Sequence, residues 1–355
     1  MAPNGRYRNP RGGRVGGGKG KPQLHWIKAY APVKDLLIGE ISLKGKAVGE
    51  FRFSGDGVIK EASPGLFFQR LVPVRYHPDR EIKASALRPQ LMKAWIQAVW
   101  NQKKALWNKW CRFYCQRTAA ALKSFEKKGW SIKKDVFELE ERMVVGLGQT
   151  NYWEVGMTWH RPSGLPYVPA SALKGITRAK VMEPIYGRII EARIKNRPSL
   201  DDEKFDQWLK ALSKETQDKI DKQLKDETKR KEDETLLWIY ELFGIQDHAG
   251  RAVFFDAFPV EAPKFVVDVM NVHYPSYYQG EGEADDTDSP NPVTFLAVDK
   301  GSKFCFAVAV RPPLGATEAD DSEVEWVWNH FVDALAERGV GSKTRLGYGR
   351  FRRGD

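Results

Sequence analysis

A glycine-rich segment near the C-terminus combines backbone freedom with positive charge. It reads Gly339-Val-Gly341-Ser-Lys343-Thr-Arg345-Leu-Gly347-Tyr-Gly349-Arg-Phe351. Its glycines allow backbone N–H groups to approach a ligand closely, while Lys343, Arg345 and Arg350 add positive charge. The segment therefore predicts a contact with phosphate. The alternative is a tight turn that needs positive φ angles and carries incidental surface bases.

Two short motifs resemble enzyme signatures but lack the residues that those enzymes need. Ser171-Ala-Leu-Lys174 matches the Ser-x-x-Lys of serine acylases, yet no Ser-Asp-Asn or Lys-Thr-Gly motif accompanies it. Gly341-Ser-Lys343-Thr344 has Ser342 where a P-loop needs glycine, and a strand rather than a helix is expected to follow. The sequence therefore argues against a serine acylase and against a P-loop NTPase.

The sequence offers little support for a metal site or a nuclease centre. Cys111 and Cys115 lack downstream ligands, and the acidic loop at 281–288 is more typical of a solvated segment than of a Mg²⁺ site. Metal-free RNA cleavage needs a general base, for which only His160, His273 and Tyr274 stand near the glycine-containing elements. Nothing local marks these three residues as catalytic, so we expect no cofactor and no metal.

The positive charge is concentrated in two segments. The 355 residues include 57 Lys and Arg against 46 Asp and Glu, a net charge of +11. Residues 1–22 hold six bases and no acid, and residues 88–128 hold ten bases and one acid. Such concentration favours a polyanion partner such as nucleic acid. The chain has three cysteines, no apolar run of membrane-spanning length and no secretory signal, which predicts a cytoplasmic protein that contacts no membrane.

The N-terminal part of the chain divides into a tail, short strands and a long helix. Residues 1–22 are rich in Gly and Arg and are expected to be disordered. Residues 36–76 contain short extended runs, and apolar spacing predicts a helix over 89–127. Four tryptophans alternate with lysines in this helix. They could stack on bases, or they could form core or a subunit interface, and the sequence does not say whether the helix faces RNA or a neighbouring subunit.

The remainder alternates strands and helices in an α+β order. We expect a strand over 136–145, a helix over 170–182 with Ser171 as its N-cap, and a charged helical insertion. Strands at 251–258, 265–273, 293–298 and 303–311 and a helix at 320–338 follow. This order predicts an elaborated ferredoxin-like fold.

Two segments together carry a family resemblance. Gly164-Leu-Pro-Tyr-Val-Pro-Ala-Ser-Ala-Leu-Lys-Gly-Ile-Thr-Arg178, preceded by Gly146-Leu-Gly148, and the C-terminal glycine-rich segment resemble the two motifs of the RAMP superfamily of CRISPR systems. Within it, Pro64-Gly-Leu-Phe-Phe-Gln-Arg70, Val272-His-Tyr-Pro-Ser-Tyr-Tyr278 and Ser289-Pro-Asn-Pro-Val-Thr-Phe-Leu296 resemble the sixth-subunit family of the Cmr (type III-B) effector complex. Ala170, where the family usually has glycine, and Arg345, where a small residue is common, depart from the pattern.

The resemblance implies a RAMP fold and a structural role. The fold would be an RRM-like (ferredoxin-like) core at 136–355, with a helical insertion at 184–240, a protruding thumb at 273–293 and an N-terminal extension at 23–135. The protein would be a non-catalytic subunit that caps a filament of Cmr subunits near the 3′ end of the guide RNA and aids capture of the complementary target RNA. One alternative is a metal-independent RAMP-type endoribonuclease that processes guide RNA precursors. Another is a single-strand RNA binder driven by its N-terminal tail.

The resemblance and the local chemistry together nominate contact residues. Phosphate or 2′-OH contacts would come from the two motifs, with Tyr348 stacking on a base, and thumb aromatics would wedge into the guide–target duplex. The RNA-binding candidates are Ser171, Lys174, Arg178, Gly341, Lys343, Thr344, Arg345, Gly347, Tyr348, Gly349 and Arg350, and the thumb candidates are His273, Tyr274, Tyr277 and Tyr278.

Overall fold

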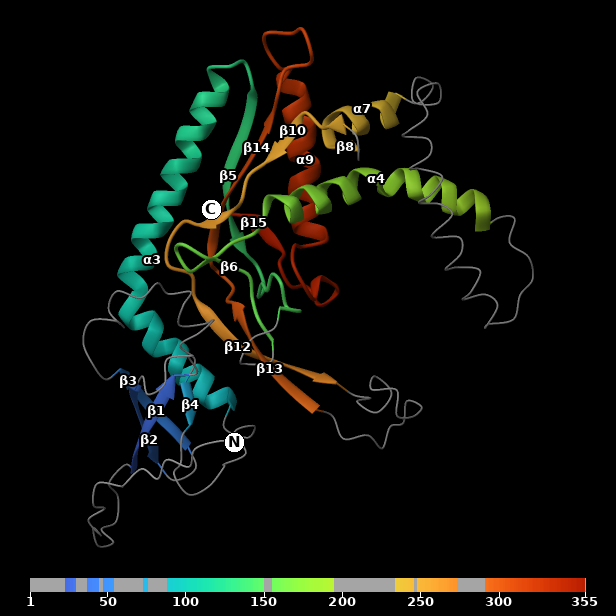
Figure 1. Cartoon of the computed structure of the whole chain (residues 1–355). Helices are drawn as coiled ribbons and strands as arrows, with labels where there is room; N and C mark the ends of the chain where they lie inside the picture. The colour runs from blue at the N-terminus through green and yellow to red at the C-terminus, as the bar shows by residue number, and fades with distance from the viewer. Residues whose placement is uncertain are drawn as a thin grey trace, which may run out of the picture.

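The computed structural model (Figure 1) describes nine segments of the chain. They are residues 23–29, 37–44, 47–53, 73–75, 88–149, 155–194, 234–245, 248–272 and 291–354. The expected tail at 1–22, most of the charged insertion and the acidic loop lie outside these segments, as do the four thumb candidates His273, Tyr274, Tyr277 and Tyr278.

A central antiparallel sheet organises the C-terminal two thirds of the molecule. Its strands β5 (Ser131–Leu139), β10 (Ala252–Phe254), β14 (Lys303–Val310) and β15 (Phe351–Arg353) lie in the order β10-β14-β5-β15, and β11 (Phe258–Pro259) also pairs with β14. With helices α4 (Ala170–Ile194) and α9 (Asp321–Glu337), the chain order is β5-α4-β10-β14-α9-β15. This is the βαββαβ order of a ferredoxin-like fold, which confirms the predicted fold class.

Helices α4 and α9 cover one face of the sheet. Helix α9 begins where the Asp320 side chain accepts a hydrogen bond from the Ser322 N–H, a typical N-cap. Its apolar side then meets the sheet, with Trp328 5.9 Å from Phe137 and Phe331 5.6 Å from Phe306, measured between ring centroids. Helix α4 packs on α9 and on β10, and α7 (Glu234–Phe243) packs on α4.

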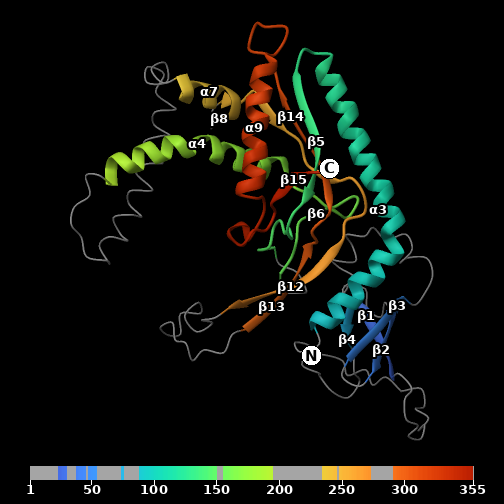
Figure 2. The ribbon, with the colours of Figure 1, turned by 180° about the vertical axis from the view of Figure 1, so that it is seen from behind.

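The long helix α3 (Arg88–Glu126) covers the opposite face, as both views show (Figures 1 and 2). Trp95 and Trp107 are fully buried. The indole N–H of Trp107 donates to the Gly164 carbonyl at 3.0 Å, and that of Trp100 donates to the Pro263 carbonyl at 3.1 Å. These contacts confirm the predicted helix and identify these tryptophans as core and packing residues.

A second sheet lies beside the N-terminal half of α3. It contains β1 (Gln23–Ala29), β2 (Leu37–Lys44), β3 (Ala47–Phe53) and β4 (Pro73–Arg75) in the antiparallel order β3-β2-β1-β4. Helix α3 contacts both β3 and the central sheet. The division into an extension at 23–135 and a core at 136–355 therefore stays a prediction.

A two-stranded ribbon extends away from the central sheet (Figure 1). Strand β12 (Phe265–Val272) pairs antiparallel with β13 (Asn291–Val298) over its whole length. The ribbon brackets the segment predicted as the thumb. Two smaller pairs join β6 (Trp159–His160) to β7 (Leu165–Pro166) and β8 (Gly244–Ile245) to β9 (His248–Ala249).

Several element boundaries differ from the sequence-based expectation. The strand expected at 136–145 begins at Ser131 and ends at Leu139, because residues after 139 pair elsewhere: Met143 bridges to Val298, and the Val144 carbonyl accepts from Ser342. Helix α4 continues through Pro184 to residue 194, so much of the expected start of the insertion is a continuation of α4. The strand expected at 251–258 is broken into β10 and β11.

Candidate functional site

The glycine-rich segment forms a compact loop between α9 and β15. Lys343 lies in the left-handed region with φ 60° and ψ 26°, and a short 3-10 helix from Thr344 to Leu346 follows it. Among the described residues, Lys343 is the only non-glycine with positive φ. This conformation costs about 1–2 kcal/mol for a residue with a Cβ, so a lysine held there is a candidate for function.

The loop glycines serve different purposes. A Cβ on Gly341 would lie 2.5 Å from the Val144 carbonyl oxygen, and one on Gly349 would lie 2.0 Å from the Val340 carbonyl oxygen. Both residues therefore allow the loop to pack against the protein's own backbone. Gly347 has φ 89° but would place a Cβ in open space. Of the three, only Gly347 has open space where a side chain would stand.

The cation of Lys343 lies over two aromatic rings. Its Nζ is 5.0 Å from the ring centroid of Phe295, on β13, and 5.8 Å from that of Tyr348. Cation–π contacts of this kind stabilise a charged amine without neutralising it. Lys343 is thus held in place at the loop surface with its charge available, and Arg345 beside it is exposed.

Tyr348 belongs to a polar cluster that ties the loop to the ribbon. Its hydroxyl donates to Oδ2 of Asp268 on β12, and Nη1 of Arg142 lies 2.8 Å from the same oxygen. Burial opposes ionisation of Asp268, but the hydrogen bonds from Tyr348 and Arg142 outweigh it and lower the pKa of Asp268. Burial and the hydrogen bond to Asp268 raise the pKa of Tyr348. The Tyr348 side chain is therefore fixed at both its hydroxyl and its ring.

The second motif opens helix α4. The Ala170 N–H donates to Oδ1 of Asp256 at 2.8 Å, so a carboxylate from the segment between β10 and β11 satisfies the first turn. The expectation that Ser171 caps the helix is wrong, because Ser171 lies inside the first turn and is exposed. Its hydroxyl is thereby left on the surface of the motif.

The two basic residues of this motif lie close to one another. Burial, reinforced by the neighbouring charge of Arg178, lowers the pKa of Lys174. Nε of Arg178 is buried without a hydrogen-bond partner, and the same holds for Nε of Arg350 in the glycine-rich loop. Buried donors of this kind are usually satisfied, so both guanidinium groups have bonding capacity left.

Ion pairs bring the two motifs to the same end of α9. Lys180 of α4 pairs with Glu337 in the last turn of α9, and Arg338 pairs with Glu183 of α4 at 3.2 Å. The glycine-rich loop begins at the next residue, Gly339. The fold therefore brings α4, the helix that begins with the second motif, beside the start of the loop.

His160, the general base considered from the sequence, is held by packing and a hydrogen-bonding neighbour. His160 packs edge-on against Tyr114 and Phe258, its Nδ1 lies 2.9 Å from the Ser163 hydroxyl, and burial lowers its pKa.

Among the described residues, no cluster of three or more His, Cys, Asp or Glu side chains could hold a metal ion. No helix in the described part of the chain is long and apolar enough to cross a membrane.

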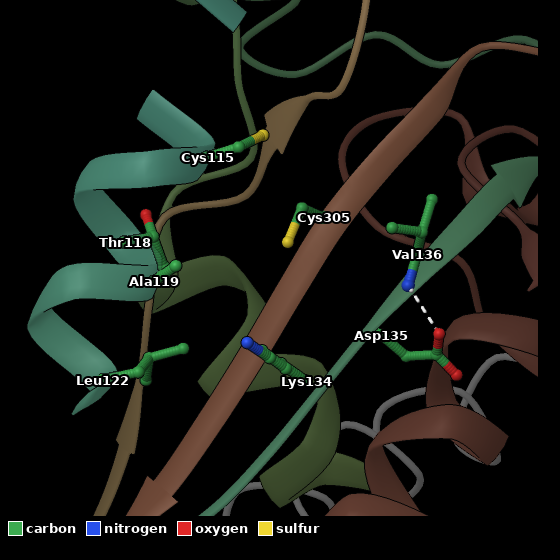
Figure 3. A pocket seen from close by; sticks show the side chains of 8 residues that line it. All are labelled: Cys115, Thr118, Ala119, Leu122, Lys134, Asp135, Val136 and Cys305. Carbon is green, nitrogen blue, oxygen red and sulfur yellow. Dashed lines mark hydrogen bonds between the residues drawn. The ribbon is translucent and has the colours of Figure 1, made fainter. Parts of the chain in front are cut away.

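The cysteines meet in a cavity between α3 and the central sheet. Figure 3 shows Cys115 of α3 and Cys305 of β14 on the wall of this cavity of about 220 Å³, near Lys134 of β5. The Cys115 thiol donates to the Pro259 carbonyl oxygen at 4.0 Å. Interaction between the two thiols is the largest influence on both: it raises the pKa of Cys115 far above its usual value and lowers the pKa of Cys305. Chain spacing did not reveal that Cys115 and Cys305 line the same cavity.

Three residues of the loop surface were missed by the sequence analysis. Asp268 is the single acid in a mostly apolar strand, a signal that could have marked it. The roles of Arg142 and Phe295 depend on distant contacts that their own positions do not reveal. Arg142 contacts Asp268, which lies 126 positions away, and Phe295 contacts Lys343, about fifty positions away.

Comparisons with known proteins give a consistent result. The sequence profile of the RAMP superfamily matches residues 136–352. The CRISPR system Cmr subunit Cmr6 of Pyrococcus furiosus (strain ATCC 43587 / DSM 3638 / JCM 8422 / Vc1) is 33% identical over 239 residues, which are 60% of this chain and 66% of the relative. The match thus spans just under two thirds of that relative's length.

Two solved structures are also similar to the chain. A chain in the cryo-EM structure of the type III-B Cmr-beta complex bound to cognate target RNA is 19% identical, with a TM-score of 0.45, over 69% of this chain and 64% of the other. The crystal structure of Cmr6 from Pyrococcus furiosus is 27% identical, with a TM-score of 0.37, over 64% of this chain and 99% of the other.

Proposed function

Because this chain belongs to the RAMP superfamily, we propose that it is an RNA-binding structural subunit of a type III-B (Cmr) CRISPR ribonucleoprotein. In this proposal it caps the filament of Cmr subunits near the 3′ end of the guide RNA, aids capture of the complementary target RNA, and has no catalytic activity of its own. It acts in the cytoplasm. The similarity to a Cmr6 subunit supports the choice within the superfamily.

The observation that carries the proposal is the way the glycine-rich loop holds Lys343. A left-handed lysine over two rings, followed by the exposed Arg345, presents fixed positive charge at a surface whose backbone is open at Gly347. Fixed cations suit phosphate, which lies at a regular spacing along any RNA. Phosphate contacts hold RNA without reading its sequence, as a subunit that accepts many guides must.

The individual roles follow from the local geometry. Lys343, Thr344, Arg345 and Arg350 contact phosphate or 2′-OH groups from the loop, and Ser171, Lys174 and Arg178 do so from α4. Gly341 and Gly349 shape the loop, and Gly347 admits the RNA backbone. Tyr348 positions Lys343 through its ring and Asp268 through its hydroxyl. The thumb residues His273, Tyr274, Tyr277 and Tyr278 wedge into the guide–target duplex.

Co-purification with the genomic neighbours tests this proposal. The tagged chain would be expressed with them, washed at moderate salt, and the bound RNA sequenced. We expect short RNAs that share a repeat-derived 5′ tag, together with other RAMP subunits. A free monomer with no RNA or with random RNA would contradict the proposal.

Two further measurements separate the alternatives. Incubation with guide precursor RNA in EDTA should leave the RNA intact, whereas a metal-independent nuclease would cut it and lose that activity on His160→Ala or His273→Ala. Deletion of residues 1–22 should leave most of the RNA affinity, whereas a tail-driven binder would lose nearly all of it.

A further inference from the structure

The outward side of helix α3 carries a ridge of cations on the sheet face opposite the glycine-rich loop. Trp95, Trp107 and Cys111 of this helix are fully buried against the sheet side, which fixes its rotation. The residues on its other side are exposed. The helix ridge is defined as the exposed residues Lys93, Lys104, Lys109, Phe113, Arg112, Arg117 and Lys123.

The charge of the ridge is strongly one-sided. Its six cations extend over 30 residues, or about 45 Å of helix at 1.5 Å per residue. The only acid in the helix is Glu126, in its last position. The like charges of such a ridge repel one another, so the ridge does not stabilise the domain unless a polyanion binds to it.

The ridge cations also lack the partners that other cations of the molecule have. None of the six pairs with a carboxylate among the described residues. By contrast, Lys133 on the central sheet pairs with Glu325 of α9 and Arg352 with Glu138. Lys133 and Arg352 thus serve the fold, whereas the ridge cations have no carboxylate partner in the described part of the chain. Lys104 lies over the Trp100 ring, with its Nζ 4.5 Å from the ring centroid, and this contact leaves its charge in place.

An aromatic side chain stands among the ridge cations. Phe113 is 47% exposed, which is unusual for a large apolar residue, and it follows Arg112 directly. It rests edge-on against Trp110, with 5.7 Å between ring centroids, so its ring is held in position. An exposed ring among cations is the arrangement with which proteins hold single-stranded nucleic acid, because the ring stacks on a base while the cations contact phosphates.

We propose that the helix ridge is a second RNA-binding surface, which holds the phosphate backbone of a single-stranded RNA independently of the glycine-rich loop. The choice of RNA as the polyanion rests on the proposed function. The position of the ridge does not, since α3 and α9 lie on opposite faces of the sheet (Figures 1 and 2). One RNA would therefore have to pass around the sheet edge to reach both surfaces, or two RNA segments bind separately.

Salt-dependent RNA binding by the full chain tests the ridge. The variant Lys104→Gln/Lys109→Gln/Arg112→Gln removes three central charges at exposed positions, and Lys300→Gln/Arg311→Gln/Arg353→Gln removes three exposed charges elsewhere. The probes are a fluorescent 30-nucleotide polyuridylate and a 20-base-pair RNA duplex. We expect the ridge variant to bind polyuridylate about tenfold more weakly at 0.1 M salt, with the slope of log K against log salt reduced by about 2. The control variant should change affinity less than twofold.

The outcomes separate this proposal from the proposed function. Loss of polyuridylate affinity in the ridge variant, with a further loss when Lys343→Gly is added, supports two surfaces. Weaker binding of Phe113→Ser to polyuridylate, but not to the duplex, supports base stacking. If the ridge variant keeps its RNA affinity while Lys343→Gly binds RNA more weakly, the ridge proposal is overturned and the proposed function stands. The same conclusion follows if the ridge variant binds RNA normally but no longer joins other RAMP subunits. If neither the ridge variant nor Lys343→Gly loses RNA affinity, the proposed function is contradicted as well.

Discussion

The two faces of the central sheet bury aromatic residues alike but treat their charges differently. On the α9 face, Arg251 and Glu323 form a buried pair, and Lys180 joins α4 to Glu337 of α9. On the α3 face, Trp95, Trp107 and Cys111 are buried together with one cation, Lys103, whose pKa is lowered by burial, while the ridge cations are exposed. The comparison teaches that net charge alone does not locate a binding surface. The pairing of each cation separates charges that hold the fold from charges that remain available.

Removal of Glu323 should have the largest effect on stability. Arg251 and Glu323 are only 8% and 7% exposed, and Glu323→Ala would leave the buried guanidinium with only the more distant and more exposed carboxylate of Glu241, at 3.7 Å. We expect a loss of about 3–5 kcal/mol in the free energy of unfolding, measured by urea denaturation. Lys133→Ala breaks the more exposed pair with Glu325 and should cost at most about 1 kcal/mol. Equal effects of the two changes would remove the distinction between buried and surface charges on this face.

A pair of glycine substitutions should sharpen the comparison within the loop. Gly349→Ala places a Cβ 2.0 Å from the Val340 carbonyl oxygen at φ 71°, so we expect a loss of about 3 kcal/mol. Gly347→Ala meets no atom within 4 Å and carries only the cost of its positive φ, about 1 kcal/mol. Thermal unfolding of both variants measures the difference. A larger loss for Gly347→Ala would mean that the open side of the loop is packed.

Lys343→Gly separates charge from backbone strain. Glycine adopts φ 60° freely, so we expect stability to change by less than about 1 kcal/mol, because relief of strain offsets the lost contacts with Phe295 and Tyr348. The affinity for polyuridylate should fall about fivefold, measured by fluorescence anisotropy, and Arg345→Ala should act similarly. Unchanged affinity in both variants would remove the loop from the RNA surface.

The smallest expected effect is a difference in alkylation rate between two thiols near α3, those of Cys305 and Cys111. Interaction with Cys115 lowers the pKa of Cys305, whereas burial raises the pKa of Cys111 to about 12. A lower pKa leaves more thiolate at a given pH, so iodoacetamide at pH 8 should alkylate Cys305 faster than Cys111. Mass spectrometry of tryptic peptides measures both rates. Cys115→Ala removes this interaction and should slow the reaction of Cys305; faster reaction there would contradict the assigned direction of the pKa shift.

Local patterns predicted much of this molecule, and long-range partners account for most of the differences. Periodic apolar residues marked α3 and α9 correctly, because each helix buries one face. The start of β5 was missed because Lys133, Lys134 and Asp135 look polar, although Lys133 faces α9 and pairs with Glu325 there. The cap of α4 was misassigned to Ser171 because its acceptor, Asp256, lies 86 positions away.

The candidate site shows the same division. Glycine content and positive charge identified the loop, yet the sequence could not tell that Gly341 and Gly349 accommodate the protein's own backbone. It also could not tell that Tyr348 is held by Asp268 of the ribbon. Both facts depend on which segments meet in three dimensions, and no local signal encodes them.

The contact between Asp268 and Tyr348 gives the ribbon the properties of a lever. Asp268 is the fourth of eight residues in β12, so the strand continues for about 13 Å beyond it. A displacement of the ribbon would move the carboxylate that accepts the Tyr348 hydroxyl, and the Tyr348 ring lies 5.8 Å from the Lys343 amine. A ligand that displaces the ribbon would thus alter the loop, and a ligand bound to the loop would restrict the movement of the ribbon.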